Sequence, residues 1–196
     1  MRYAPPMKTR LVMLLVVLLI PSASRAQTSD SGVGAALTPS TATSVNNMHM
    51  TIRRNLIEAA EAMPAADYSF KPTPQIRSFA ELIAHVAFAN FYICSLAKGE
   101  MTVQSNFERT MTEKPGLLKV LGDALNYCDG VHKETTDATA NQAVKVSGPG
   151  GQGQSTRALV LMFNVTHNNE HYGNVILYLR LKGIVPPSTA RAQGQK

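Results

Sequence analysis

Apolar residues recur at three- and four-residue steps over four stretches of the chain, each about twenty residues long. This spacing places them on one face of an α-helix, so each stretch predicts an amphipathic helix. The first helix is expected from about 43 to 63, where Pro64 ends it. Its apolar stripe consists of Met48, Ile52, Leu56, Ala59 and Met63.

The ends of the other three helices carry recognisable signals. The second begins at Ser78, which has Glu81 at the spacing of a capping box, and ends at Gly99. The third opens near Pro115, a residue suited to a first helical turn. The fourth is expected from about 155 to 182, with Gly183 after it.

Two further patterns complete the expected fold. Residues 147–155 are rich in glycine and predict a flexible loop. No stretch alternates with period two for long, so no sheet is expected. Four amphipathic helices of this length predict an all-α fold, a four-helix bundle.

The N-terminal residues have the pattern of a secretory signal peptide, predicted over 1–26. Basic residues and no acid occupy 1–10, an unbroken apolar run occupies 11–20, and small residues stand at 24 and 26. A membrane anchor is the alternative, but ten residues reach only about 15 Å as a helix, half of a bilayer core. We therefore expect an exported protein, periplasmic or extracellular, with no membrane anchor after cleavage.

The remainder divides into three segments. Residues 27–42 are small and polar and predict a flexible tether. Residues 43–188 form the helical domain, and 189–196 are expected to be a disordered tail. The whole chain has 19 Lys and Arg against 13 Asp and Glu, but four of the basic residues lie before Gln27. No clustered basic face remains, so a nucleic-acid partner is not expected.

Two cysteines, Cys94 and Cys128, would meet an oxidising compartment after export. A disulfide between them is one outcome, but sequence alone cannot set their separation. Cys128 lies on the apolar stripe of the third helix and is expected in the core.

His167 and His171 are four residues apart, so both imidazoles stand on one face of the fourth helix. Val160, Phe163, Asn174 and Tyr178 fall near the same line, which predicts an inward-facing stripe that is mostly apolar. Imidazoles there are costly to bury unless they are hydrogen-bonded or bound to a ligand.

His85, on the second helix, is a candidate third ligand. Alone, a histidine in this position is more often a satisfied core residue. Facing the pair, it completes three nitrogen ligands with an open position, an arrangement that favours zinc and also suits nickel or iron. Cys94 is about 180° round the helix from His85 and makes a poor fourth ligand. His49 and His132 are expected on solvated helix flanks.

These residues resemble the DinB/YfiT-like family of metal-binding four-helix bundles. The resemblance rests on His85 in the capped second helix, on His167-Asn168-Asn169-Glu170-His171 and on the segment from Tyr172 to Pro187. It implies that His85, His167 and His171 bind a divalent metal. In many relatives an acid follows the first histidine of the pair and a glutamine stands three after the second, where this chain has Asn168 and Asn174.

Three functions remain open from the sequence. The first is a metal-dependent transferase or hydrolase that acts on a small-molecule ligand, with Asn174 and Tyr178 as hydrogen-bond partners in the site. The second is a metal-binding or structural bundle without turnover. The third is an interaction module that has lost the use of its histidines. A homodimer is an assembly consistent with each of them.

Overall fold

A computed structural model describes residues 40–100, 106–148 and 151–194. The predicted signal peptide and most of the predicted tether lie outside these residues. The long helices are α1 (Thr41–Ala62), α2 (Phe79–Lys98), α4 (Lys114–Glu134) and α6 (Arg157–Leu181). The shorter elements between them are η1 (Ala65–Asp67), α3 (Phe107–Thr110), α5 (Asp137–Ala140), β1 (Ala143–Gly148) and β2 (Gly151–Thr156), and α7 (Pro187–Ala192) follows α6.

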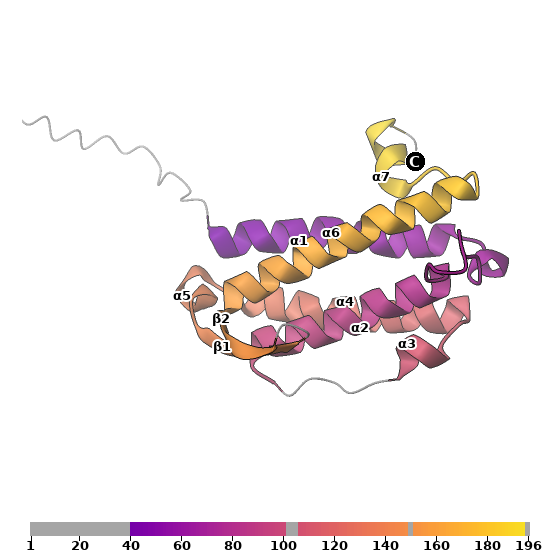
Figure 1. Cartoon of the computed structure of the whole chain (residues 1–196). Coiled ribbons are helices and arrows are strands. Elements are labelled where there is room, and N and C mark those ends of the chain that lie inside the picture. Colours follow the sequence, from indigo (N-terminus) through magenta and orange to yellow (C-terminus); the bar gives the residue numbers. More distant parts are fainter. Residues whose placement is uncertain (1–39, 101–105, 149–150, 195–196) are drawn as a thin grey trace, which may run out of the picture. The chain divides into compact units, whose positions relative to one another are not determined.

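The four long helices form a bundle, as the sequence predicts (Figure 1). Both α1 and α2 pack against α4 and α6, so α1 lies diagonally opposite α2. Figure 1 shows α1 and α6 running one way and α2 and α4 running the other way. The helix α4 thus runs in the same direction as α2, and α3 lies between them in the sequence. This topology lets the N-terminal half of α2 face the C-terminal half of α6.

The predicted helix ends are confirmed by their local hydrogen bonds. Ser78 and Glu81 form a complete capping box at the start of α2, which fixes the helix that carries His85. Gly99 ends α2 at a φ of 78°, a left-handed conformation that glycine adopts without strain. Thr156 caps α6 through the backbone amide of Leu159.

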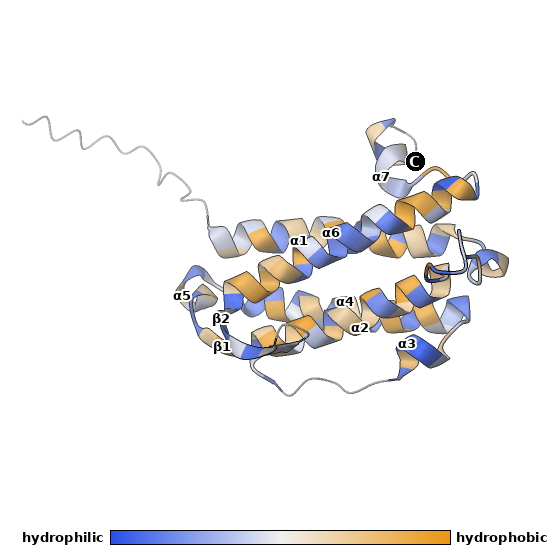
Figure 2. Ribbon diagram, viewed as in Figure 1, coloured by the Kyte–Doolittle hydropathy of each residue, from blue (hydrophilic) through white to orange (hydrophobic). Residues whose placement is uncertain are grey.

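The core is apolar and lies between the four helices. Its largest fully buried side chains include Phe79, Ile83, Leu121 and Leu179. Among the described residues only α2 is long and apolar enough to cross a membrane, and 72% of its most apolar window is buried within the bundle. Figure 2 shows α6 as polar in its middle between two apolar ends, and His167 and His171 lie in that polar middle.

Two short segments differ from the predictions. Of the expected flexible loop at 147–155, the described residues 147–148 and 151–155 belong to an antiparallel hairpin, in which β1 pairs with β2. In β1 the apolar residues Val144 and Val146 alternate with polar residues. The strand β2 has no large apolar residue, so it shows no such alternation and is held by backbone hydrogen bonds to β1. Residues 189–192, expected to be disordered, lie in α7. The Arg191 side chain of this helix bonds Glu58 and Asn55 on α1.

The prediction that His49 and His132 are solvated is wrong, because both are almost completely buried. Ile52, Leu56, Ala59 and Met63 of the expected α1 stripe are buried, but its first residue, Met48, is 55% exposed and the neighbouring His49 is buried instead. The two rings stack with centroids 4.0 Å apart. His49 donates from Nε2 to Asp129 at 2.7 Å, and His132 Nε2 lies 3.4 Å from Oδ1 of Asn164.

Burial lowers the pKa of both histidines, and for His132 it does so to about 3, with a further contribution from His49. The unfolded chain therefore binds protons below pH 6.5 that the folded chain does not, and stability falls as the pH falls through that window. We expect metal-free protein to lose about 2 kcal/mol from the His132 site between pH 7 and pH 5. Urea unfolding at both values measures this loss.

The matched control for this pH dependence is the His132→Gln variant. Its free energy of unfolding should change less between pH 7 and pH 5 than that of the wild type. Equal pH dependence in the two proteins would show that His132 does not contribute.

Candidate metal centre

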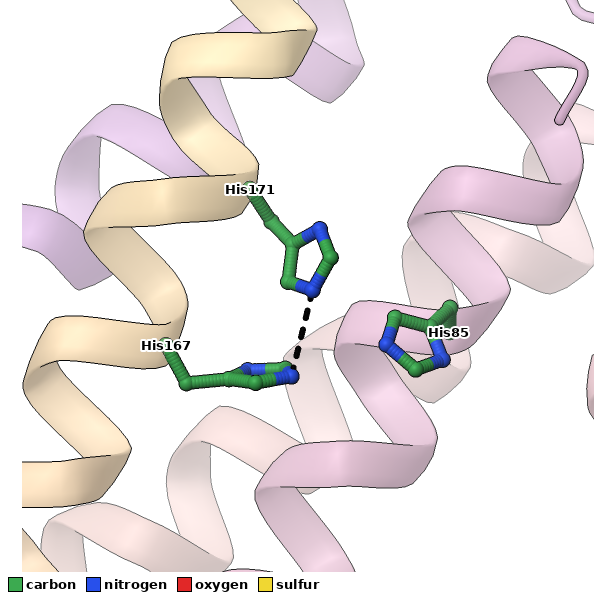
Figure 3. A group of neighbouring side chains, drawn as sticks. All are labelled: His85, His167 and His171. Atoms are coloured by element: carbon green, nitrogen blue, oxygen red, sulfur yellow. Dashed lines mark hydrogen bonds between the residues drawn. The ribbon is translucent and has the colours of Figure 1, made fainter. Parts of the chain in front are cut away.

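Three histidines from two helices meet at one point between α2 and α6 (Figure 3). His85 comes from the second turn of α2, and His167 and His171 come from successive turns of α6. One ring nitrogen from each lies within 4.8 Å of the others. The structure thus brings together the three histidines that the sequence singled out. Among the described residues they are the only such cluster of potential ligands.

The spacing of the nitrogens fits a shared cation. Nε2 of His167 and Nε2 of His171 are 3.1 Å apart. Two nitrogens bound to one tetrahedral zinc ion at 2.0–2.1 Å would lie roughly 3.3 Å apart. The Nδ1 atoms of both rings are buried without a hydrogen-bond partner among the described residues. The donor set and its convergence fit a divalent metal that accepts imidazole ligands.

The electrostatics keep the pair on α6 neutral. Burial is the main cause that lowers the pKa of His167, to about 4, and the charges of His171 and His85 act in the same direction. The pKa of His171 is lowered by burial and then by His85. Metal binding requires the unprotonated imidazole, so both residues are in the binding form at neutral pH.

Glu108, on α3, is a site residue that the sequence analysis missed. One of its carboxylate oxygens lies 2.7 Å from Nδ1 of His85, and both side chains are partly buried. When Nδ1 donates to this carboxylate, Nε2 of His85 is left as the nitrogen with a free lone pair. Metal-binding histidines are commonly oriented in this way by a carboxylate. No periodicity or spacing links a four-residue helix to His85.

Replacing Glu108 by glutamine should weaken metal binding about tenfold, and at most about 100-fold. The new amide oxygen could still accept from Nδ1 of His85, but it lacks the negative charge that makes the imidazole a stronger ligand. Competition with a chromogenic chelator measures the affinity. Glu113→Gln, on the same connection and exposed, is the control and should bind as the wild type does. Unchanged metal affinity in Glu108→Gln would show that the Glu108 carboxylate does not contribute to metal binding.

The predicted inward-facing stripe on α6 is only partly correct. Val160 and His171 are buried, but Phe163 is 56% exposed and Asn174 is also exposed. The buried face passes instead through Asn164, Asn168 and Val175, so the histidines lie along its edge. A metal bound there would have solvent or a ligand on its open side.

Within the described part of the chain, neither Asn174 nor Tyr178 forms a hydrogen bond with any of the three histidines. Tyr178 is buried, and its hydroxyl donates to the backbone carbonyl of Arg77 at 2.5 Å, joining the end of α6 to the start of α2. The role of both residues in the site stays a prediction.

Asn168, the residue directly after His167, is completely buried and faces the core. Its amide exchanges hydrogen bonds of 2.9 Å with the Asn90 side chain on α2, and Asn164 donates to the same Asn90 oxygen at 2.9 Å. All three amides are fully buried, so their polar groups depend on one another. This network sets the register of α6 against α2, directly beside His167.

Comparison with known sequences gives one family. A sequence model described as the DinB superfamily matches residues 50–175, which include all three histidines. No curated protein matches the chain.

Solved structures share the fold at low sequence identity. A DinB-like protein from Bacillus cereus is 14% identical, with a TM-score of 0.63, over 74% of this chain and 95% of that one. YfiT from Bacillus subtilis, called a probable metal-dependent hydrolase with an unusual four-helix bundle topology, is 13% identical (TM-score 0.58; 73% and 88%). A mycothiol-dependent maleylpyruvate isomerase is 16% identical (TM-score 0.56; 68% and 60%).

Proposed function

The chain belongs to the DinB superfamily, and we propose from its site that it is an exported, metal-dependent hydrolase of a small substrate. The observation that carries this proposal is the convergence of His85, His167 and His171, with ligand nitrogens within 4.8 Å of one another. Zinc suits three imidazoles with an open position, and nickel and iron are the alternatives.

In this proposal the three histidines bind the ion, and a neighbouring carboxylate orients one of them. His167 and His171 would bind it from α6, and His85 would bind it through Nε2, with Nδ1 held by Glu108 at 2.7 Å. A divalent ion held here would polarise a substrate oxygen and would acidify a water or a thiol at its open position. The buried Asn90–Asn168 pair beneath the site keeps α2 and α6 in register.

Two further observations support parts of the proposal. Cys94 and Cys128 form a disulfide, and disulfides persist mainly in oxidising compartments, which supports export. YfiT, which shares the fold, is called a probable metal-dependent hydrolase. The alternative is a transferase in which a small thiol takes the open position; the mycothiol-dependent isomerase that shares the fold favours it.

The test is hydrolysis of a chromogenic acetate ester by purified protein with zinc, after removal of zinc by a chelator, and after zinc is restored. Hydrolysis that disappears and returns with zinc supports the proposal. The cobalt-substituted protein gives the second readout, because a thiol or azide that enters the open position changes its visible spectrum.

A site with no exchangeable position would overturn the proposal. In that case the cobalt spectrum would not respond to added ligand, no ester would be hydrolysed, and chelation would lower the melting temperature strongly. The ion would then be structural, joining α2 to α6.

A further inference from the structure

A pocket of about 540 Å³ lies beside the candidate metal centre. Its wall is made by the connection before α2, the start of α2, and α3. Glu108 lines the pocket and also bonds His85, so the pocket and the metal site share a side chain. Arg77 lines it as well, and its carbonyl accepts from Tyr178 on the histidine-bearing α6. A volume of this size suits a small molecule.

The pocket contains charged side chains that are already paired and others that are not. Both acids are already engaged: Glu81 pairs with Lys71 at 2.9 Å, and Glu108 with His85. Arg77 and Arg109 are exposed and form no ion pair within the described part of the chain. The pocket therefore presents two guanidinium groups without partners.

Unpaired arginines are not the rule in this protein. Arg53, Arg54 and Arg191 pair with carboxylates. Arg157 donates to the backbone carbonyl of Ala97. Among the described arginines, the only other one without a partner is Arg180, which does not line the pocket. Two of the three unpaired guanidiniums thus lie in the one pocket that adjoins the histidines.

Glu108 connects this pocket to the metal centre, because it lines the pocket together with Arg77 and lies 2.7 Å from Nδ1 of His85. A ligand anchored at Arg77 would therefore lie beside the histidine cluster. Guanidinium groups bind carboxylates and phosphates through paired N–H donors.

Resting on the proposed function, we propose that this pocket binds the anionic group of the substrate. Arg77 and Arg109 hold a carboxylate, and the group to be hydrolysed extends towards the histidines. The substrate class is thus a small acid-bearing ester or amide. A phosphate-bearing substrate uses the same chemistry and is tested alongside it.

The test measures binding of succinate, of its neutral diamide and of inorganic phosphate to zinc-loaded protein by calorimetry. The variants are the double substitution Arg77→Gln/Arg109→Gln and the control Arg180→Gln, which removes one unpaired, exposed arginine outside the pocket. Succinate should bind the wild type and the control alike, and the double variant at least about tenfold more weakly. The diamide should bind none of them measurably, and phosphate binding stronger than that of succinate would assign the pocket to phosphate esters.

Metal content and melting temperature, measured on the same samples, separate this inference from the proposed function. If all proteins hold one zinc and the double variant binds both anions as the wild type does, the inference is overturned and the proposed function stands. If the wild type holds no zinc, the proposed function fails, and the substrate assignment fails with it.

Discussion

Replacing His167 by alanine is expected to abolish stoichiometric metal binding. The wild type should hold one metal ion per chain, and the variant should lose more than about 100-fold in affinity, since loss of a residue that merely orients a ligand already costs 10- to 100-fold. His167 supplies one of only three imidazole nitrogens in the cluster. Inductively coupled plasma mass spectrometry of the dialysed protein measures the ratio of metal to protein.

The control for His167→Ala is Asn169→Ala. Asn169 is on the same helix, two residues away, and is exposed. Its side chain donates to the carbonyl of Val165 and does not belong to the cluster. This variant should retain one metal ion. Equal metal content in wild type and His167→Ala would show that the cluster is not the site, even if metal is present.

The metal content of His167→Ala is informative only if this variant folds. His167 lies at the edge of the buried face, so its removal should leave the bundle intact. Without metal, the variant should melt close to the wild type treated with chelator. A much lower melting temperature would mean that the metal loss reports unfolding. In that case His171→Ala provides the second measurement of the same site.

The sequence predicts the bundle and the three histidines well because both depend on local periodicity. A period of 3.6 residues fixes which residues share a face, and a capping box fixes where α2 begins. His167 and His171 are adjacent for the same reason. That His85 meets them depends on the topology, and the family resemblance supplied this part of the prediction.

The features that were missed depend on contacts between distant segments. Glu108 reaches His85 from a four-residue helix across 23 positions of sequence. The burial of His49 depends on the hydrogen bond of its Nε2 to Asp129 and on its stacking against His132, both of which are on α4. Residue type favours a solvated position for both rings, and only the partners from α4 and α6 change that. The amides of Asn90, Asn164 and Asn168 are buried for the same reason.

Removing the disulfide between Cys94 and Cys128 should lower the free energy of unfolding by about 4 kcal/mol. The bond closes a loop with a sequence separation of 34, and the loop-entropy relation gives roughly this value. Both cysteines are fully buried, so the double variant Cys94→Ala/Cys128→Ala should leave no unpaired polar group. Urea unfolding of the wild type and of the double variant measures the difference.

Reductant provides the control for this prediction. Wild-type protein unfolded with dithiothreitol present should approach the stability of the double variant, and the double variant should not respond to dithiothreitol. If the wild type and the double variant unfold at the same urea concentration, the bond contributes no stability.

The wild type and the double cysteine variant also test whether the metal centre depends on the disulfide of α2. This helix is joined to α4 by the disulfide at Cys94 and faces α6 through His85, nine residues earlier. Asn90 lies between these two positions and bonds Asn168 on α6, so the register of α2 against α6 does not depend on the disulfide. The double variant should therefore still bind one metal ion at a temperature at which it is folded. Loss of the metal from a folded double variant would show instead that the disulfide positions His85.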